Sequence, residues 1–305
     1  MRFLLITFLL LISACSGYSK VLDCVCGEEN DKGLIILHTS GKKIVNGSEV
    51  RPHKYPWMAV MMKSYHHVCG GSIISDMLIL TAGHCMYYIP SPLKSRWIIG
   101  SHSVKEAVNA RQQSYDTKDY DLHPLWKAGN LFDNFDMALV ITNRRMTFTS
   151  AAIPICMPKV GDEKLFWNQK VVIAGWGRVE ENGAQTDVLM ESSVYLKTHR
   201  ECKNLIYSIN YDERSMICAH EQHTDACQGD SGGPIFAAKS NDHYVILGVV
   251  SFGDGCARDF PGIYAKVSEP VTIKWINQKI ASTNSNVCRN PEFSFMKRVA
   301  ETLVK

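Results

Sequence analysis

The chain has 305 residues, of which 46% are hydrophobic and 21% are charged, and its formal net charge is only +3. This length and composition are typical of a globular protein with one large or two modest cores. The basic residues are scattered and form no long Lys/Arg block, so neither nucleic acid nor an anionic membrane is expected as the main partner.

The first residues have the pattern of an export signal. A positively charged start is followed by the apolar run FLLITFLLLI (3–12) and by small residues at positions 13, 14 and 16. This order predicts a signal peptide over residues 1–16 and a secreted, extracellular protein. A membrane anchor is the alternative, but the run is too short to cross a bilayer and no second candidate exists in the sequence.

A polar, glycine-containing leader follows over residues 17–43, and the character of the sequence changes at Ile44. The segments 72–80, 171–177 and 244–253 are rich in β-branched and aromatic residues and are bounded by turn-forming residues. Long helical periodicity is scarce, so we expect an all-β barrel architecture rather than βαβ units.

One helix is predicted near the end of this region. Ser268 is a candidate N-cap, Pro270 suits the first turn, and isoleucines at positions 273, 276 and 280 repeat at helical spacing. In the tail, 283–305, apolar residues at 295 or 296, 299, 300 and 303 could line one face of a short helix. We expect a docked or frayed amphipathic tail rather than a membrane-binding one.

The chain has eleven cysteines, and Cys15 is expected to leave with the signal peptide. The ten that remain are an even number in an oxidising compartment, so disulfides are expected. CVC (24–26) lacks a complementary cluster at zinc-like spacing, and two adjacent histidines such as His66 and His67 point to opposite faces of a strand. No metal and no cofactor are expected.

Three short stretches carry residues with catalytic potential: LTAGHC (80–85) with His84, NFDMALV (134–140) with Asp136, and GDSGGP (229–234) with Ser231. A serine hydroxyl is a poor nucleophile unless an imidazole within hydrogen-bonding reach takes its proton, and that imidazole needs a partner to fix its tautomer. A carboxylate at the start of an apolar strand is costly unless it is paired. Glycines beside the serine let the backbone turn sharply and present N–H groups to an oxyanion.

With these three motifs in the order His, Asp, Ser, the sequence resembles the chymotrypsin/trypsin family of serine proteases. The resemblance runs from IVNG (44–47) to WI (275–276). It implies two antiparallel six-stranded β-barrels, at about 44–165 and 166–282, with the active site between them and a C-terminal helix. The expected protease domain is 44–282.

The resemblance also implies roles for single residues. Ser231 attacks the scissile carbonyl, His84 is the base and then the acid, and Asp136 orients His84. The N–H groups of Gly229 and Ser231 form the oxyanion hole, and Ser251 hydrogen-bonds the buried aspartate and lines the cleft.

The two aspartates before Ser231 receive different roles. Asp230 matches the family residue that pairs with the new α-amino group after zymogen cleavage. Lys43 precedes Ile44, so a trypsin-like activating protease could cut there and free Ile44. Because burying an ammonium requires a carboxylate partner, this pair would order the oxyanion hole.

Asp225 matches the base of the primary specificity pocket, and Gly253 and Gly262 match its two walls. An open pocket with a carboxylate at its base favours Arg or Lys at the cleaved bond. If Asp225 were instead an exposed loop acid, an elastase- or chymotrypsin-like pocket would remain.

Family positions imply three disulfides: Cys69–Cys85, Cys202–Cys218 and Cys227–Cys256. The four cysteines left are Cys24, Cys26, Cys156 and Cys288. One of Cys24 and Cys26 would pair with Cys156 and tie the leader to the protease domain, and the other would pair with Cys288; the sequence does not say which. This arrangement also resembles secreted arthropod proteases, including venom and haemolymph forms.

Several positions depart from the family pattern. Gly83 stands where Ala is usual, which predicts slightly looser packing, and Phe252 replaces the commoner Trp of the substrate-binding strand. The stretch 100–115 lacks the acidic pair of calcium-binding trypsins, so no calcium site is expected. Asn46 begins an NGS sequon that is either unused or glycosylated.

Two functions remain. The first is an active, secreted, trypsin-like endopeptidase made as a zymogen, with protein or peptide substrates and protein inhibitors as partners. The second is a catalytically silent homologue that serves as a binding module. The intact His, Asp and Ser positions favour the enzyme.

Overall fold

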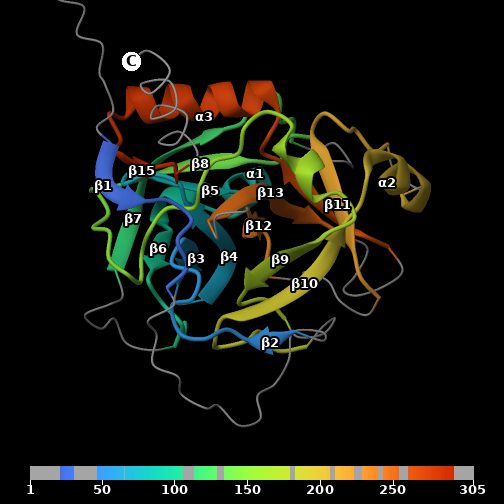
Figure 1. The fold of residues 1–305 in the computed structure, drawn as a ribbon. Coiled ribbons are helices and arrows are strands. Elements are labelled where there is room, and N and C mark those ends of the chain that lie inside the picture. Colours follow the sequence, from blue (N-terminus) through green and yellow to red (C-terminus); the bar gives the residue numbers. More distant parts are fainter. Residues whose placement is uncertain are drawn as a thin grey trace, which may run out of the picture.

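The computed structural model describes residues 21–30, 47–64, 66–105, 113–128, 134–178, 183–206, 210–222, 229–239, 243–253 and 260–291. Most regular structure in this part of the chain is β-strand (Figure 1). None of its helices combines the length and the apolar character needed to cross a membrane.

The first barrel is a closed ring of six antiparallel strands. Around the ring they are β3 (Met58–Lys63), β4 (His66–Ile73), β5 (Leu78–Thr81), β8 (Ala138–Thr142), β7 (Gln113–Leu122) and β6 (Arg96–Ile99). β5 and β8 are buried along their whole length, which explains their continuous apolar sequences LILT and ALVIT.

The second barrel is also a six-membered antiparallel ring, closed by a pairing between its first and last strands. In order these are β11 (Met216–His220), β14 (Gly262–Lys266), β13 (Tyr244–Phe252), β12 (Pro234–Ala238), β9 (Lys170–Gly175) and β10 (Met190–Leu196). The predicted all-β fold with two six-stranded barrels is therefore confirmed.

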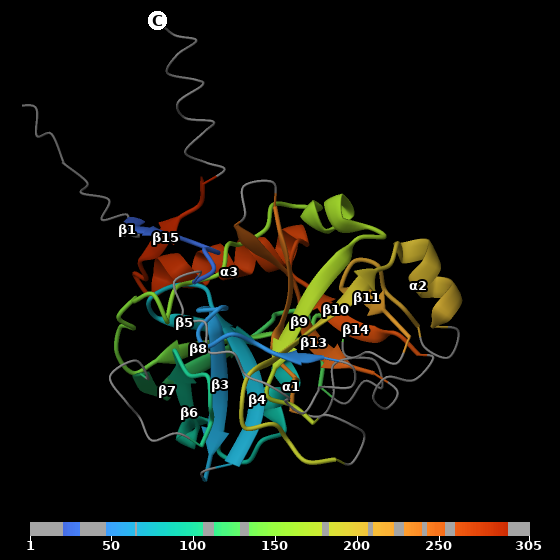
Figure 2. The ribbon, with the colours of Figure 1, turned by 60° about the horizontal axis from the view of Figure 1, so that its bottom comes forward.

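Each barrel also holds a segment from the far end of the chain. The short strand β2 (Ser48–Glu49) precedes the first barrel but pairs with β10 of the second. The C-terminal helix α3 (Pro270–Ser282) follows the second barrel, yet Trp275 Nε1 donates to Asp121 Oδ2 of β7 at 3.1 Å. Figures 1 and 2 show α3 lying along the first barrel. The segment before the first barrel therefore contacts the second barrel, and the helix after the second barrel contacts the first.

The predicted helix is present, but its predicted cap is wrong. Glu269 is the N-cap, and its carboxylate accepts the N–H groups of Val271 at 2.6 Å and Thr272 at 3.3 Å. The hydroxyl of Ser268 is turned instead to the buried carboxylate of Glu163. A carboxylate at a helix N-terminus also interacts favourably with the helix dipole.

The remaining helical segments are α1 (Gly83–Tyr87), α2 (His199–Leu205) and the 3₁₀ turns Pro92–Lys94 and Asp162–Phe166. α2 begins with a capping box in which Thr198 accepts the N–H of Glu201 at 3.3 Å and the Glu201 side chain accepts the N–H of Thr198 at 2.8 Å.

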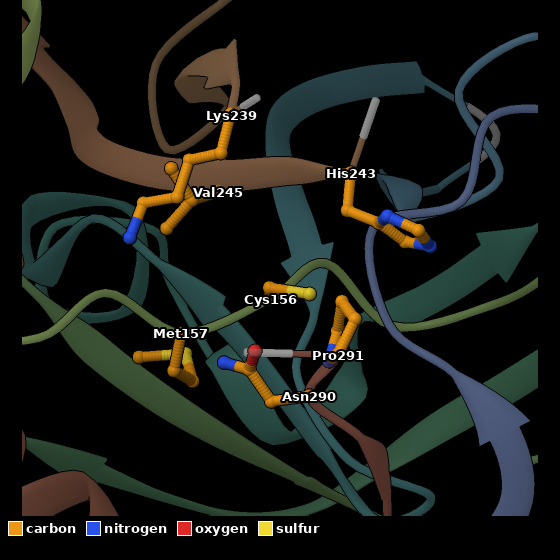
Figure 3. A pocket seen from close by; sticks show the side chains of 7 residues that line it. All are labelled: Cys156, Met157, Lys239, His243, Val245, Asn290 and Pro291. Carbon is orange, nitrogen blue, oxygen red and sulfur yellow. The ribbon is translucent and has the colours of Figure 1, made fainter. Parts of the chain in front are cut away.

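The leader is joined to the rest of the chain by a parallel pair of strands and two disulfides. β1 (Val21–Val25) lies beside β15 (Val287–Arg289), and the bonds are Cys24–Cys288 and Cys26–Cys156. This resolves the pairing that the sequence left open. Figure 3 shows Cys156 beside Asn290 and Pro291 on one side of a small pocket, with Lys239, Val245 and His243 across it.

Candidate active site

His84 is held at the start of α1 by one carboxylate. The backbone N–H of His84 donates to Asp136 Oδ1 at 2.8 Å, and its ring Nδ1 donates to Asp136 Oδ2 at 2.7 Å. Since an ionised carboxylate can only accept, the proton of the neutral ring sits on Nδ1, and Nε2, which lies 3.6 Å from Cys85 Sγ, carries none. The Asp136 side chain is fully buried and that of His84 is 23% exposed, so the imidazole alone reaches solvent.

Asp136 is placed by the strained residue before it. Phe135 has a φ of +57°, and its carbonyl accepts the N–H of Met137 at 2.6 Å in a tight turn just before β8. A left-handed conformation costs a non-glycine residue about 1–2 kcal/mol. The side chain of Ser251 donates a third hydrogen bond, at 2.6 Å, to Asp136 Oδ2.

Ser231 lies in a turn that leans on the first barrel. Gly229 and Gly232, on either side, have φ values of +103° and +82°, which favour glycine. The carbonyl of Ser231 accepts the N–H of Gly70 at 2.8 Å. A Cβ on Gly232 would lie 2.2 Å from the hydroxyl oxygen of Thr81, the last residue of β5. The serine turn is thus pressed against the strands that lead to His84.

Asp230 points away from the serine into the second barrel. It is 4% exposed, and its Oδ1 accepts the N–H of Gly177 at 2.8 Å. A Cβ on Gly175 would lie 2.0 Å from Oδ1, and one on Gly177 would lie 2.5 Å from the carboxylate. Only glycine at both positions leaves room, a requirement the sequence interpretation of this GWG stretch (175–177) missed.

Comparison with known proteins agrees with this arrangement. The trypsin family model matches residues 44–276. The chain belongs to the trypsin family. One curated relative of this trypsin-family chain is transmembrane protease serine 5 from Homo sapiens, which is 31% identical over 240 residues. The alignment covers 77% of this chain and 51% of the relative, so the chain spans about half the length of that protein.

This relative is not an arthropod protein, so the resemblance to secreted arthropod proteases stays a prediction. The relative's name describes a transmembrane protein, and the secretion of this trypsin-family chain also stays a prediction.

The described residues of this trypsin-family chain include only part of its predicted specificity and activation sites. Lys43, Ile44 and Asn46 lie outside the described residues, as do Asp225 and the expected pair Cys227–Cys256. Of the predicted pocket walls, Gly262 lies in β14 opposite Ala219 of β11, and Gly253 directly follows β13 on the surface.

Two disulfides join helices to barrel strands. Cys69 of β4 is bonded to Cys85 of α1, and Cys202 of α2 to Cys218 of β11, which are the two described pairs that the resemblance implies. Among the described residues, the group of metal-ligating types with the required spacing is Cys69, His84 and Cys85. Its two sulfur atoms are joined to each other, so they cannot serve as thiolate ligands.

His67 lies closer to the site than the sequence suggested. Its ring is 3.5 Å from where a Cβ of Gly229 would be, and its centroid is 6.4 Å from that of Trp176. Burial lowers the pKa of His67 to about 4, although nearby backbone groups of Cys69 and Trp176 oppose the shift. His67 is therefore a neutral packing residue beneath the serine turn near pH 7.

The expectation of looser packing at Gly83 is wrong. A Cβ there would lie 3.1 Å from Asp136 Oδ1 and 3.1 Å from Cδ2 of Trp126. The carboxylate and the indole ring already crowd the place of the missing methyl, so this position is closely packed without it.

Proposed function

We propose that this trypsin-family chain is a secreted serine endopeptidase, made as a zymogen cleaved after Lys43, that hydrolyses peptide bonds after Arg or Lys. The observation that carries the proposal is the pair of hydrogen bonds that buried Asp136 accepts from the backbone N–H and the ring Nδ1 of His84, at 2.8 and 2.7 Å. Such a clamp fixes both the orientation and the tautomer of the imidazole, which a general base requires.

In the proposed reaction, Ser231 Oγ attacks the scissile carbonyl carbon while His84 Nε2 takes the hydroxyl proton. The carbonyl oxygen becomes an oxyanion that accepts the N–H groups of Gly229 and Ser231. His84 then gives its proton to the leaving amine, and an acyl-enzyme remains. Water repeats the sequence on the ester, so the acid is released and Ser231 regains its proton.

Asp136 keeps its charge throughout and stabilises the imidazolium that forms beside it. Its side chain is fully buried and accepts three hydrogen bonds, the third from Ser251, so no reorganisation of water is needed when the charge appears.

Selection of Arg or Lys is assigned to Asp225, with Gly253 and Gly262 as the pocket walls. A carboxylate at the base of a narrow slot pairs with a cationic side chain that would otherwise be buried unpaired. Changing Asp225 to Ser should lower cleavage after Arg by about 100-fold or more while Ser231 stays reactive. Unchanged cleavage after Arg would remove Asp225 from the pocket.

Activation is assigned to Lys43, Ile44 and Asp230. The buried Asp230 lies one residue before Ser231, so an ammonium that pairs with its carboxylate would act directly on the turn of the oxyanion hole. A Lys43→Gln chain should remain intact and inactive, and full activity from that chain would overturn the zymogen proposal. The partners are an activating trypsin-like protease, substrates with Arg or Lys at the cleaved bond, and protein inhibitors.

The proposal is tested on purified protein cleaved after Lys43, with a serine-directed phosphonate and a short Arg ester or amide. We expect stoichiometric labelling of Ser231 and turnover, both absent from a Ser231→Ala control that is otherwise folded. A folded wild-type chain that is neither labelled nor active would instead be a catalytically silent binding module.

A further inference from the structure

An indole ring lies against the residue that precedes His84. The Cδ2 and Cε2 atoms of Trp126 are 3.1 and 3.2 Å from the position that a Cβ of Gly83 would occupy. The same position is 3.1 Å from Asp136 Oδ1, the oxygen that accepts the backbone N–H of His84. Trp126 therefore packs against the start of α1, at the point where the carboxylate of Asp136 accepts the backbone N–H of His84.

Trp126 is anchored to the segment that carries Asp136. Residues 123–126 form a turn in which the N–H of Trp126 donates to the carbonyl of His123 at 2.9 Å, with Pro124 at its second position. The N–H of His123 in turn donates to the carbonyl of Met137 at 2.9 Å. Two backbone hydrogen bonds thus connect Trp126, through His123, to the residue after Asp136.

The side chain of His123 packs this turn against two other segments. Its ring stacks on Phe135 with centroids 4.8 Å apart, and its Nε2 is 3.1 Å from the hydroxyl of Thr272 in α3. Because Phe135 is the strained residue before Asp136, one packing unit fixes both the carboxylate and the ring that covers it.

Two tyrosines of α1 and its end cover the outer side of the indole. The centroid of Tyr87 lies 5.2 Å and that of Tyr88 lies 6.5 Å from the Trp126 ring, both in edge-to-face geometry. The tyrosines are 52% and 56% exposed, whereas Trp126 is 8% exposed. The tyrosine rings are thus exposed to solvent, and the indole lies buried beneath them.

We propose that Trp126 is a positioning residue for the proposed reaction, matched in volume to Gly83, which sets the start of α1 against Asp136 and keeps water from Oδ1. The inference rests on the proposed function, since it concerns the base His84. Trp126 acts through Asp136 and the backbone of α1. A small displacement of a general base costs rate rather than substrate affinity, so the effect belongs in kcat.

The pair is tested with the Lys43-cleaved protein and a short Arg substrate. We expect Trp126→Ala to lower kcat by about tenfold or more with KM within about twofold of wild type. Trp126→Tyr, which keeps an aromatic ring, should lose less. Trp167→Ala is the matched control: its indole is partly buried against the second barrel, 5.7 Å from His199, and should leave kcat unchanged.

Complementarity between the two residues gives a second readout. Gly83→Ala should lower kcat because the added methyl presses on the indole and on Oδ1. Combining Gly83→Ala with Trp126→Tyr should recover part of that loss, because the smaller ring makes room for the methyl. A double variant no better than Gly83→Ala would overturn the inference.

The outcomes separate the two proposals. A wild-type protein without turnover would overturn the proposed function first. A wild-type protein with turnover and a Trp126→Ala variant of equal kcat would overturn only the positioning role. If Trp126→Ala is not secreted as a folded protein, the kcat of Trp126→Tyr and of the double variant decides the matter.

Discussion

Replacing Asp76 by alanine would remove side-chain hydrogen bonds that join the C-terminal segment to the first barrel. The Asp76 side chain is 4% exposed, and both its oxygens accept Arg145 Nη1, at 2.9 and 2.7 Å. The backbone N–H and the side-chain amide of Asn286 donate to the same carboxylate, each at 2.7 Å. One carboxylate therefore joins three segments that are far apart in sequence.

The expected cost follows from these contacts. Breaking a buried ion pair costs about 3–5 kcal/mol, since the remaining partners are left unpaired. The Arg145 side chain is 44% exposed and can regain water, which places Asp76→Ala at the lower end, about 3 kcal/mol. For a domain of this size that is a fall in Tm of about 6–12 °C.

The assay is urea-induced and thermal unfolding of the disulfide-intact protein, followed by tryptophan fluorescence. Asp116→Ala is the matched control: its carboxylate pairs with Arg96 at 3.2 Å, but both side chains are more than half exposed. We expect that variant to lose less than about 1 kcal/mol. Equal losses for the two aspartates would refute the reasoning that burial gives Asp76 its weight.

Three further predictions concern other regions. Burial lowers the pKa of His123 to about 4, so between about pH 6.5 and 4 the unfolded chain binds a proton that the folded chain does not. Stability should therefore fall as the pH is lowered through that window, and the free energy of unfolding of His123→Gln, measured in urea, should depend less steeply on pH. Ser251→Ala should lower kcat by about tenfold by removing a charge-assisted hydrogen bond to Asp136, and an unchanged kcat with the Arg substrate would contradict this. Removing the Cys24–Cys288 bond with serines should leave the leader attached through its second disulfide, and its release from the cleaved protein on a non-reducing gel would exclude the observed pairing.

The sequence alone determined the fold class and the residue types of the site. A strand buried on one face has apolar residues at every second position, and a strand buried on both faces has a continuous apolar run, so both patterns predict strands. The motifs around His84, Asp136 and Ser231 are readable because nucleophilic catalysis needs those groups and a turn with positive φ favours glycine, both local requirements.

Other features depend on partners far away in the chain. Glu269 rather than Ser268 caps the helix because the Ser268 hydroxyl donates to Glu163, a residue over a hundred positions earlier in the chain. The pairing of Cys24 and Cys26 was undetermined because neighbouring cysteines have the same local sequence, and the parallel register of β1 against β15 decides between them.

The meaning of single glycines was decided only by tertiary contacts. At Gly83 the sequence shows a missing methyl, and the structure shows the Trp126 ring that crowds its place, 43 positions further along the chain. At Gly175 and Gly177 the space belongs to the carboxylate of Asp230. A glycine in the sequence can indicate that another group approaches the backbone closely. It does not identify that group, because the group belongs to another part of the chain.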